Sequence, residues 1–266
     1  MNKQSVLITG AYGGMGWETA KMLTQNGFQV FALDQKTGDA QENIIPVQAD
    51  ITDLESVQNA CQTVMKQTDS LYAIIHFAGV YMLDSLVEME EKQFQRIFKI
   101  NVEGVFLVNK TFLPLLKSGS RILITTSELA TLDPLPFTGI YAVTKAALDK
   151  YAYSLRMELQ LLGITVSVLR AGAVSTGMLG VSTAALDRFC EHTALYTCNA
   201  DRFRKIVNKV EARSISPDKI AKKVAKILHK RKPGFAYSVN RNPLLILLNL
   251  LPKKIQLAII GWILHP

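Results

Sequence analysis

The sequence predicts an α/β protein built on one doubly wound, mostly parallel sheet of seven strands. Short apolar runs rich in Val, Ile and Phe alternate with longer stretches of helical period from the first residues to about position 240. The chain has 266 residues, 48% of them hydrophobic, which is enough for one large core. The runs lack polar alternation, as expected for strands that helices cover on both faces.

The candidate strands, in chain order, are 5–9, 29–33, 44–48, 71–77, 121–126, 165–169 and 235–239. The helical period covers 14–26, 53–67, 88–117, 139–162 and 216–231. Gly27 and Gly163 are predicted to end two of these helices, and Asp53 with Glu55 to begin another. Such sheets bind ligands beyond the carboxyl ends of their strands, so function is expected in the loops there.

The cysteines and the first ten residues restrict the class of protein to which the chain can belong. Cys61, Cys190 and Cys198 are too few and too scattered for a disulfide framework, and no Cys/His cluster has metal-ligand spacing, so no metal site is expected. The opening MNKQSVLITG has too short an apolar run for a secretory signal. We therefore expect a cytoplasmic protein in a reducing compartment.

The net charge of +8 is unevenly distributed along the chain. Residues 1–201 contain 15 Lys/Arg and 20 Asp/Glu, whereas residues 202–266 contain 15 and 2. A basic half suggests an anionic partner or a solvated helix face. The basic residues alternate with apolar ones and lack interleaved aromatics, so no nucleic-acid partner is expected.

The first predicted strand runs directly into TGAYGGMG, with Gly10, Gly14 and Gly16 at the turn before a helix. Glycines there permit a tight turn and the approach of backbone N–H groups to a pyrophosphate, which the positive end of the helix favours. The strand before the loop and the helix after it favour a dinucleotide site over a simple tight turn.

Asp34 closes the second predicted strand, 18 residues after Gly16. A carboxylate there accepts hydrogen bonds from ribose hydroxyls and repels a 2′-phosphate. NAD is therefore favoured over NADP, although the nearby Lys36 blurs this preference.

Tyr141 and Lys145 stand four residues apart in GIYAVTKAAL and share a helix face, so the ammonium can lie near the phenol. A nearby cation can bring the phenol, whose free pKa is about 10, towards acid/base work near neutrality. Ser127 ends a predicted strand and supplies a hydroxyl at its carboxyl end, with Thr125 and Thr126 as rival donors.

Asn101 follows the amphipathic stretch QFQRIFKI. It is either a buried capping amide or part of a polar relay.

Together these motifs resemble the short-chain dehydrogenase/reductase family over about residues 1–240, and in particular its branch acting on steroids, retinoids and other hydrophobic alcohols. The fold that the resemblance implies is a single Rossmann-type domain. Its cofactor residues would be Thr9, Gly10, Gly14, Met15, Gly16, Asp34, Asp50, Ile51, Ala78, Gly79, Tyr141, Lys145, Val174 and Thr176.

The catalytic tetrad of the family falls on Asn101, Ser127, Tyr141 and Lys145. The resemblance implies that Tyr141 is the general acid/base and that Ser127 polarises the substrate oxygen. Lys145 would lower the pKa of the tyrosine and hold the nicotinamide ribose, and Asn101 would support a proton relay.

The chain departs from the family pattern at three points. The usual NNAG reads His76-Phe77-Ala78-Gly79, so His76 either replaces a structural amide or titrates near the cofactor. The usual Pro-Gly after the sixth strand reads Ala-Gly at 171–172, and the spacing of 14 from Ser127 to Tyr141 is long.

The strand and helix rhythm breaks at about 177–212, where the family builds a substrate lid. The apolar residues of this segment are Met178, Leu179, Val181, Leu186, Phe189, Leu195 and Tyr196. With Leu132, Leu135 and Phe137 they suit a bulky apolar alcohol or ketone, or they simply pack the lid onto the body.

The segment 242–266 contains two apolar blocks separated by Pro252, Lys253 and Lys254. This interruption argues against a membrane-spanning helix and favours two short amphipathic helices, on a membrane surface or on a second subunit. We expect this extension to follow a catalytic domain at 1–241, to attach the protein to a surface rather than complete the cofactor site, and the protein to be a homo-oligomer.

The function predicted from the sequence is NAD-dependent hydride transfer between nicotinamide and a hydrophobic secondary alcohol or its ketone. Two alternatives stay open. One is an enzyme acting on a polar substrate, such as a sugar or an acyl carrier, and the other is a catalytically idle NAD-binding scaffold.

Overall fold

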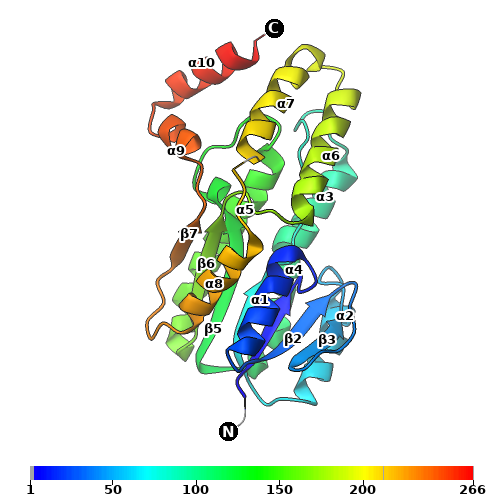
Figure 1. Cartoon of the computed structure of the whole chain (residues 1–266), viewed down its shortest axis with the longest axis vertical. Helices are drawn as coiled ribbons and strands as arrows, with labels where there is room; N and C mark the ends of the chain where they lie inside the picture. The colour runs from blue at the N-terminus through cyan, green and yellow to red at the C-terminus, as the bar shows by residue number, and fades with distance from the viewer. Residues whose placement is uncertain (1–2, 212, 266) are drawn as a thin grey trace.

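The computed structural model describes residues 3–211 and 213–265, without the side chains of 178–183, 201 and 208–211. Its centre is a seven-stranded sheet in the order β3-β2-β1-β4-β5-β6-β7, in which all neighbouring strands run parallel (Figure 1). The strands are β1 (Ser5–Thr9), β2 (Gln29–Asp34), β3 (Ile44–Gln48), β4 (Leu71–His76), β5 (Leu116–Ser127), β6 (Thr165–Ala171) and β7 (Ala236–Val239). The predicted fold class is confirmed.

The two faces of the sheet have separate helical layers. Five helices supply them: α1 (Gly14–Gln25) and α8 (Pro217–Leu228) on one face, and α2 (Leu54–Met65), α4 (Gly104–Phe112) and α5 (Gly139–Leu159) on the other. In β1, Val6 and Ile8 pack with the first pair of helices, whereas Leu7 packs with the other three. This alternation of successive side chains explains why each strand reads as an unbroken apolar run.

The single helix predicted over 88–117 is wrong. The structure contains α3 (Glu91–Phe98), a π-helical turn (Lys99–Glu103), α4 and a short 3-10 turn (Leu113–Leu115), after which β5 begins at Leu116. Pro114 lacks the N–H that a continuing helix needs. The pairing of Leu116 with Leu71 of β4 then draws the chain into the sheet five residues before the predicted start of the strand.

The predicted helix-end signals act as expected. Gly27 and Gly163 have φ angles of +85° and +74°, the left-handed conformation that glycine adopts without strain at a helix end. The Asp53 carboxylate accepts a hydrogen bond from the Glu55 N–H and caps α2.

A separate helical layer lies beyond the carboxyl ends of the strands (Figure 1). It consists of α6 (Gly177–His192), α7 (Thr197–Glu211), α9 (Pro243–Asn249) and α10 (Lys253–Leu264). Phe137 joins this layer to the body, because its ring contacts those of Phe189 and Phe203 at centroid distances of 4.3 and 5.0 Å. The tail forms two short helices separated at Pro252, as predicted, and none of the helices in the described ranges is long and apolar enough to cross a membrane.

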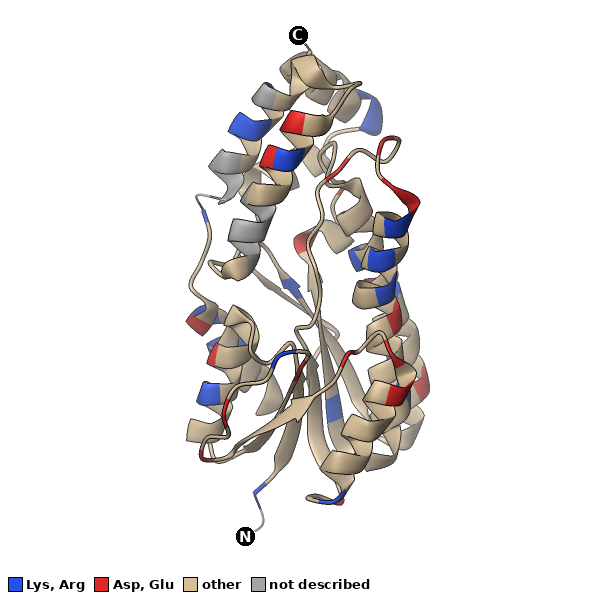
Figure 2. Cartoon of the chain, turned by 90° about the vertical axis from the view of Figure 1, so that its right-hand side faces the viewer, with Lys and Arg blue, Asp and Glu red and all other residues tan. Residues whose placement is uncertain are grey.

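Charged side chains lie mainly on the helices and loops, with both signs interspersed, and the strands of the sheet carry few of them (Figure 2). One exception is the partly buried ion pair between Arg170 of β6 and Asp149 of α5, at 2.7 Å. It is held by a second hydrogen bond from Arg170 Nε to Asp149 at 2.9 Å, and this bidentate geometry fixes α5 against the sheet.

Candidate active site

Two adjoining cavities open at the carboxyl ends of the strands. The larger, of about 870 Å³, is lined by the glycine loop and the ends of β2 and β4, and we call it the glycine-loop cleft. The smaller, of about 330 Å³, is lined by Ser127, Tyr141 and Lys145, and we call it the inner pocket. Met15, Gly79, Tyr81 and Thr176 line both, so the two cavities share a wall.

Most of the residues predicted to bind a cofactor line these cavities. Those in the glycine-loop cleft are Gly10, Gly14, Met15, Gly16, Asp34, Asp50, Ile51, Ala78, Gly79 and Thr176. Tyr141, Lys145 and Val174 line the inner pocket. Thr9 is fully buried and lines neither cavity. Its hydroxyl accepts a hydrogen bond from the Ala78 N–H at 3.4 Å.

The glycine loop is shaped by the absence of side chains. Gly10 has a φ of +66°, and a Cβ on it would lie 2.6 Å from the Ala78 nitrogen. A Cβ on Gly16 would lie 2.1 Å from the Gly10 oxygen, and one on Gly14 would lie 2.8 Å from Thr176 Cγ2. The N-terminus of α1 is therefore free to meet an anionic group in the cleft.

Two carboxylates are fixed on the far wall of the cleft. Asp34 ends β2 and accepts backbone N–H groups from Tyr12 at 3.0 Å and Gln35 at 2.8 Å. Burial raises the pKa of Asp50, but hydrogen bonds from Thr52 and the charge of Lys99 outweigh it, so the net pKa is lowered. Asp50 is therefore ionised at neutral pH.

Of the cations in this cleft, Lys36 was identified from the sequence, but the three from the segment after β4 were not. Lys92 and Arg96 of α3 and Lys99 of the π-helical turn line the cleft, as Lys36 does. Their spacing along the amphipathic stretch, at positions 92, 96 and 99, was the available signal, because it places them on one helix face.

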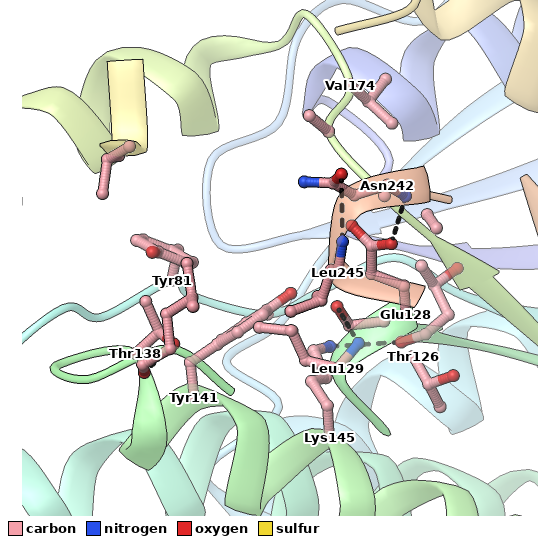
Figure 3. Close-up of a pocket in the computed structure, with 18 of the residues that line it drawn as sticks. Tyr81, Thr126, Glu128, Leu129, Thr138, Tyr141, Lys145, Val174, Asn242 and Leu245 are labelled. Atoms are coloured by element: carbon pink, nitrogen blue, oxygen red, sulfur yellow. Dashed lines mark hydrogen bonds between the residues drawn. The ribbon is translucent and has the colours of Figure 1, made fainter. Parts of the chain in front are cut away.

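Ser127, from the end of β5, and Tyr141, from the first turn of α5, both line the inner pocket. Tyr141 lies beside Tyr81 (Figure 3). Burial raises the pKa of Tyr141 and the neighbouring Tyr81 raises it further, while a hydrogen bond with Ser127 lowers it in part. The Tyr81 and Tyr141 ring centroids are 4.9 Å apart. The rival Thr126 instead donates its hydroxyl to Asp149.

Lys145 lies one turn along α5 from Tyr141. Its Nζ is 5.6 Å from the Tyr141 ring centroid and donates to the Thr125 carbonyl at 3.2 Å. Burial lowers the pKa of Lys145 to about 8. In the protein alone, burial therefore raises the pKa of Tyr141. The family resemblance implies instead that Lys145 lowers it.

Asn101 is fully buried and lines neither cavity. Its Oδ1 accepts the Val80 N–H at 2.8 Å, and its Nδ2 donates to the Val80 carbonyl at 2.9 Å and to Thr144 at 3.2 Å. The π-helical turn turns this amide towards the loop after β4. Its side chain therefore positions the wall at Gly79 and Val80.

His76, the departure from the family pattern, is buried at the end of β4. Its Nε2 donates to Asn109 Oδ1 at 2.9 Å, and Asn109 in turn donates to the Tyr151 hydroxyl at 3.2 Å. Burial lowers the pKa of His76 to about 4. The structure therefore favours the interpretation that His76 replaces a structural amide, and not the one that it titrates near the cofactor.

We expect His76 to make stability depend on pH. The unfolded chain binds a proton at His76 near pH 6.5 and the folded chain only near pH 4, so stability is lost as the pH falls through this window. Chemical unfolding of a His76→Asn variant should show about 2 kcal/mol less loss between pH 7 and pH 5 than the unmutated chain. The exposed His192→Asn is the control, and equal pH dependence of all three proteins would contradict this assignment.

The predicted lid residues have mixed roles. Leu135 lines the inner pocket, whereas Leu186, Phe189, Tyr196 and Phe137 pack the lid onto the body. Leu195 is exposed, and Leu132 does not line the pocket. The side chains of Met178, Leu179 and Val181 lie outside the described residues.

The sequence missed the role of the tail in this pocket. Leu244, Leu245 and Leu248 of α9 line it, with Ile206 and Val207 of α7. Leu245 lies opposite Tyr141 (Figure 3). The tail therefore forms part of the wall of the inner pocket, although none of its residues lines the glycine-loop cleft.

The tail is held to the loop that follows Ser127. Glu128 is only 8% exposed, and its Oε2 accepts the Asn242 N–H at 2.6 Å (Figure 3). Burial raises the pKa of Glu128, an effect that this hydrogen bond and Arg241 partly offset. The Asp133 N–H donates to Asn249 Oδ1 at 2.6 Å, so α9 is attached at both of its ends.

The family profile described as short chain dehydrogenase matches residues 4–187. An uncharacterized oxidoreductase, YbbO of Escherichia coli, is 30% identical over 263 residues, which cover 96% of this chain and 93% of that protein. The 3-ketodihydrosphingosine reductase of Bacteroides thetaiotaomicron is 26% identical over 90% of this chain and 88% of its own length.

Mouse estradiol 17-beta-dehydrogenase 2 is 32% identical over 68% of this chain, and the match spans only 50% of that enzyme. Among solved structures, a short chain dehydrogenase family protein from Francisella tularensis superimposes with a TM-score of 0.75 at 20% identity, covering 90% of this chain and 97% of that one. A 3-ketoacyl-(acyl-carrier-protein) reductase from Brucella melitensis in complex with NADH gives 0.73 at 22% identity, covering 89% and 96%. These structures share the fold.

Proposed function

Because the chain belongs to the short-chain dehydrogenase family of oxidoreductases, we propose that it transfers a hydride between a nicotinamide cofactor and a hydrophobic secondary alcohol or its ketone. One observation carries the choice of substrate. The inner pocket ends in the hydroxyls of Ser127 and Tyr141, while the rest of its wall is mainly aliphatic, from α7, α9 and Leu135. A sugar would place hydroxyls against these aliphatic side chains, which offer them no hydrogen-bond partner.

The fit of a dinucleotide rests on the glycine-loop cleft. Its floor at Gly10, Gly14 and Gly16 has no room for a Cβ, and the N-terminus of α1 faces it. Asp34 and Asp50 would bind the adenosine half, with Lys145 and Thr176 at the nicotinamide end. When bound, the nicotinamide accepts the hydride from an alcohol or donates it to a ketone.

The catalytic roles follow from the pocket geometry. In alcohol oxidation, Ser127 donates a hydrogen bond to the substrate oxygen and the ionised Tyr141 oxygen takes its proton, while the hydride leaves the substrate carbon and a C=O bond forms. Ketone reduction reverses each transfer. Protonated Lys145 stabilises the phenolate, which the buried site otherwise disfavours. Asn101 positions Val80 and Gly79 beside them.

NADH formation across steroids, retinols, long-chain secondary alcohols and polyols tests this proposal. We expect turnover of apolar alcohols with kcat/KM at least about a hundredfold above that for polyols, because only apolar surface matches the wall. A polyol as the best substrate would indicate the polar-substrate alternative. NAD binding without turnover of any alcohol or ketone would indicate an idle scaffold.

We further propose that the enzyme prefers NAD to NADP. We expect Asp34→Ala to reduce the ratio of kcat/KM with NAD to kcat/KM with NADP by about tenfold or more. The substitution removes the carboxylate that would repel a 2′-phosphate, and Lys36 and Arg96 remain in the cleft to attract one. Steady-state kinetics with both cofactors measures this, with the exposed Asp39→Ala as the control. Equal kcat/KM for NAD and NADP in the unmutated protein would contradict the preference.

We also propose that the tail attaches the protein to a membrane surface. Leu250, Leu257 and Trp262 are 76%, 71% and 81% exposed on or beside α9 and α10. Lys253 and Lys254 lie between the two apolar blocks, where cations can meet anionic headgroups while the apolar side chains enter the acyl boundary.

Flotation of the full chain with vesicles tests this attachment. We expect flotation with anionic lipid, less with neutral lipid and less at high salt, and its loss in a Leu257→Ser/Trp262→Ser variant. Leu161→Ser, on an equally exposed leucine outside the tail, should float unchanged. A full chain that stays in solution, with an apparent mass that the double substitution halves, would show instead that the tail is a dimer interface.

A further inference from the structure

A third cavity adjoins the inner pocket. It lies between α7, α9, α10 and the loop that contains Leu135 and Pro136 and precedes α5. Its volume is about 340 Å³, and every one of its twelve lining residues is Leu, Ile, Phe or Pro. We call it the tail cavity. The reaction chemistry described above uses none of its residues at the reacting atoms, so it requires a separate explanation.

The tail cavity adjoins the inner pocket. Four side chains line both: Leu135, Ile206, Leu244 and Leu248. At its other side, Leu247 and Ile263 line the cavity and are 61% and 42% exposed, so it also reaches the surface of the tail. The two adjoining cavities therefore present apolar side chains from the inner pocket to the exposed apolar surface of α9 and α10.

We infer that the tail cavity binds the alkyl chain of the substrate, and that the substrate is a single-chain lipid alcohol or ketone. This inference rests on the proposed oxidoreductase function and narrows its substrate class. The hydroxyls of Ser127 and Tyr141 lie in the inner pocket, whereas none of the described residues that line the tail cavity is polar. The oxidisable carbon therefore enters the inner pocket and the chain passes between α7 and α9.

A linear chain fits this path better than a rigid ring system. Each cavity alone is near the lower end of the volume range of small-molecule sites. A flexible chain can bend past the four shared side chains and occupy both, whereas a fused-ring substrate would have to fit in the inner pocket alone. Burial of each additional CH₂ group is worth about 0.8 kcal/mol, so affinity should rise with chain length until the path is filled.

Adjacent residues provide a matched pair of variants. Leu251 is half-buried and lines the tail cavity, whereas Leu250 is 76% exposed and lines none of the cavities described. Leu251→Trp should fill the cavity, and Leu250→Trp adds the same side chain outside it. Leu247→Trp, at the exposed mouth, is a second blocking variant should Leu251→Trp fail to fold.

The experiment measures kcat/KM of the full chain for linear 2-alkanols from hexanol to hexadecanol in cyclodextrin, with NAD binding as a check on folding. We expect kcat/KM to rise with chain length in the unmutated protein and in Leu250→Trp. In Leu251→Trp it should be unchanged for hexanol and lower by about tenfold or more for the longest alcohols.

Three outcomes would overturn the inference. They are a flat dependence on chain length, an equal effect of Leu250→Trp and Leu251→Trp, and an equal loss for short and long alcohols in Leu251→Trp. Turnover of hydroxysteroids with any of these results would leave the proposed function standing without the alkyl-chain site. Absence of turnover with every apolar alcohol and ketone would reject both.

Discussion

Replacement of Tyr141 by Phe is expected to reduce turnover by more than about a hundredfold while the cofactor still binds. The substitution removes only the hydroxyl that meets Ser127 and leaves the ring against Tyr81 in place. The glycine loop and Asp34 line the other cavity, so the nucleotide contacts stay intact. Steady-state kinetics gives the loss in kcat, and fluorescence titration with NADH gives the affinity.

Tyr153→Phe is the matched control for this variant. It removes a hydroxyl from the same helix, α5, at a half-exposed position outside both cavities, and should leave kcat unchanged. Wild-type turnover in Tyr141→Phe would show that another group transfers the proton.

Substitution of Gly16 by Ala is expected to lower both cofactor affinity and stability. The new Cβ would lie 2.1 Å from the Gly10 oxygen and 2.8 Å from the Ala11 Cα, and both are backbone atoms that cannot rotate away. Relieving this overlap must displace the loop from β1 or from α1, at a cost of about 1–3 kcal/mol or more. We expect the Kd for NADH to rise by more than about tenfold and Tm to fall.

Gly13→Ala tests whether this effect depends on position. Its Cβ would approach the same Gly10 oxygen, but at 3.3 Å, a contact that a small adjustment of the loop relieves. The loss in affinity and in Tm should therefore be clearly smaller than for Gly16→Ala. Equal losses in the two variants would mean that any methyl group in the loop is harmful and that the close approach at Gly16 has no special role.

The sequence predicted the parts of the fold that local pattern determines. The seven strands, the glycine loop and the helix ends at Gly27 and Gly163 each depend on residues within one short segment. The predicted helix over 88–117 failed at its end for two reasons. Pro114 is a local signal that the prediction did not use, and a partner distant in sequence decides where the next strand begins. Leu116 enters the sheet through pairing with Leu71, and the sequence around Leu116 gives no indication of that contact.

The site was predictable to the same degree. Ser127, Tyr141 and Lys145 converge in one pocket as their places at a strand end and on one helix face imply. The roof of that pocket was not predictable, because the apolar pattern of α9 is equally compatible with an outer surface. Only the tertiary arrangement shows that Leu245 faces the pocket while Leu250 faces solvent.

The two attachments of α9 to the loop after Ser127 also couple opening of the pocket to local unfolding. The Asn242 N–H is held by Glu128 and the Asp133 N–H by Asn249, so α9 cannot lift away until both hydrogen bonds break. These two amides, far apart in sequence, then belong to one cooperative opening unit and exchange their hydrogens with a common opening free energy. On the proposed function, a product that leaves between α9 and this loop waits for that opening, so weakening either contact should speed release and leave hydride transfer unchanged.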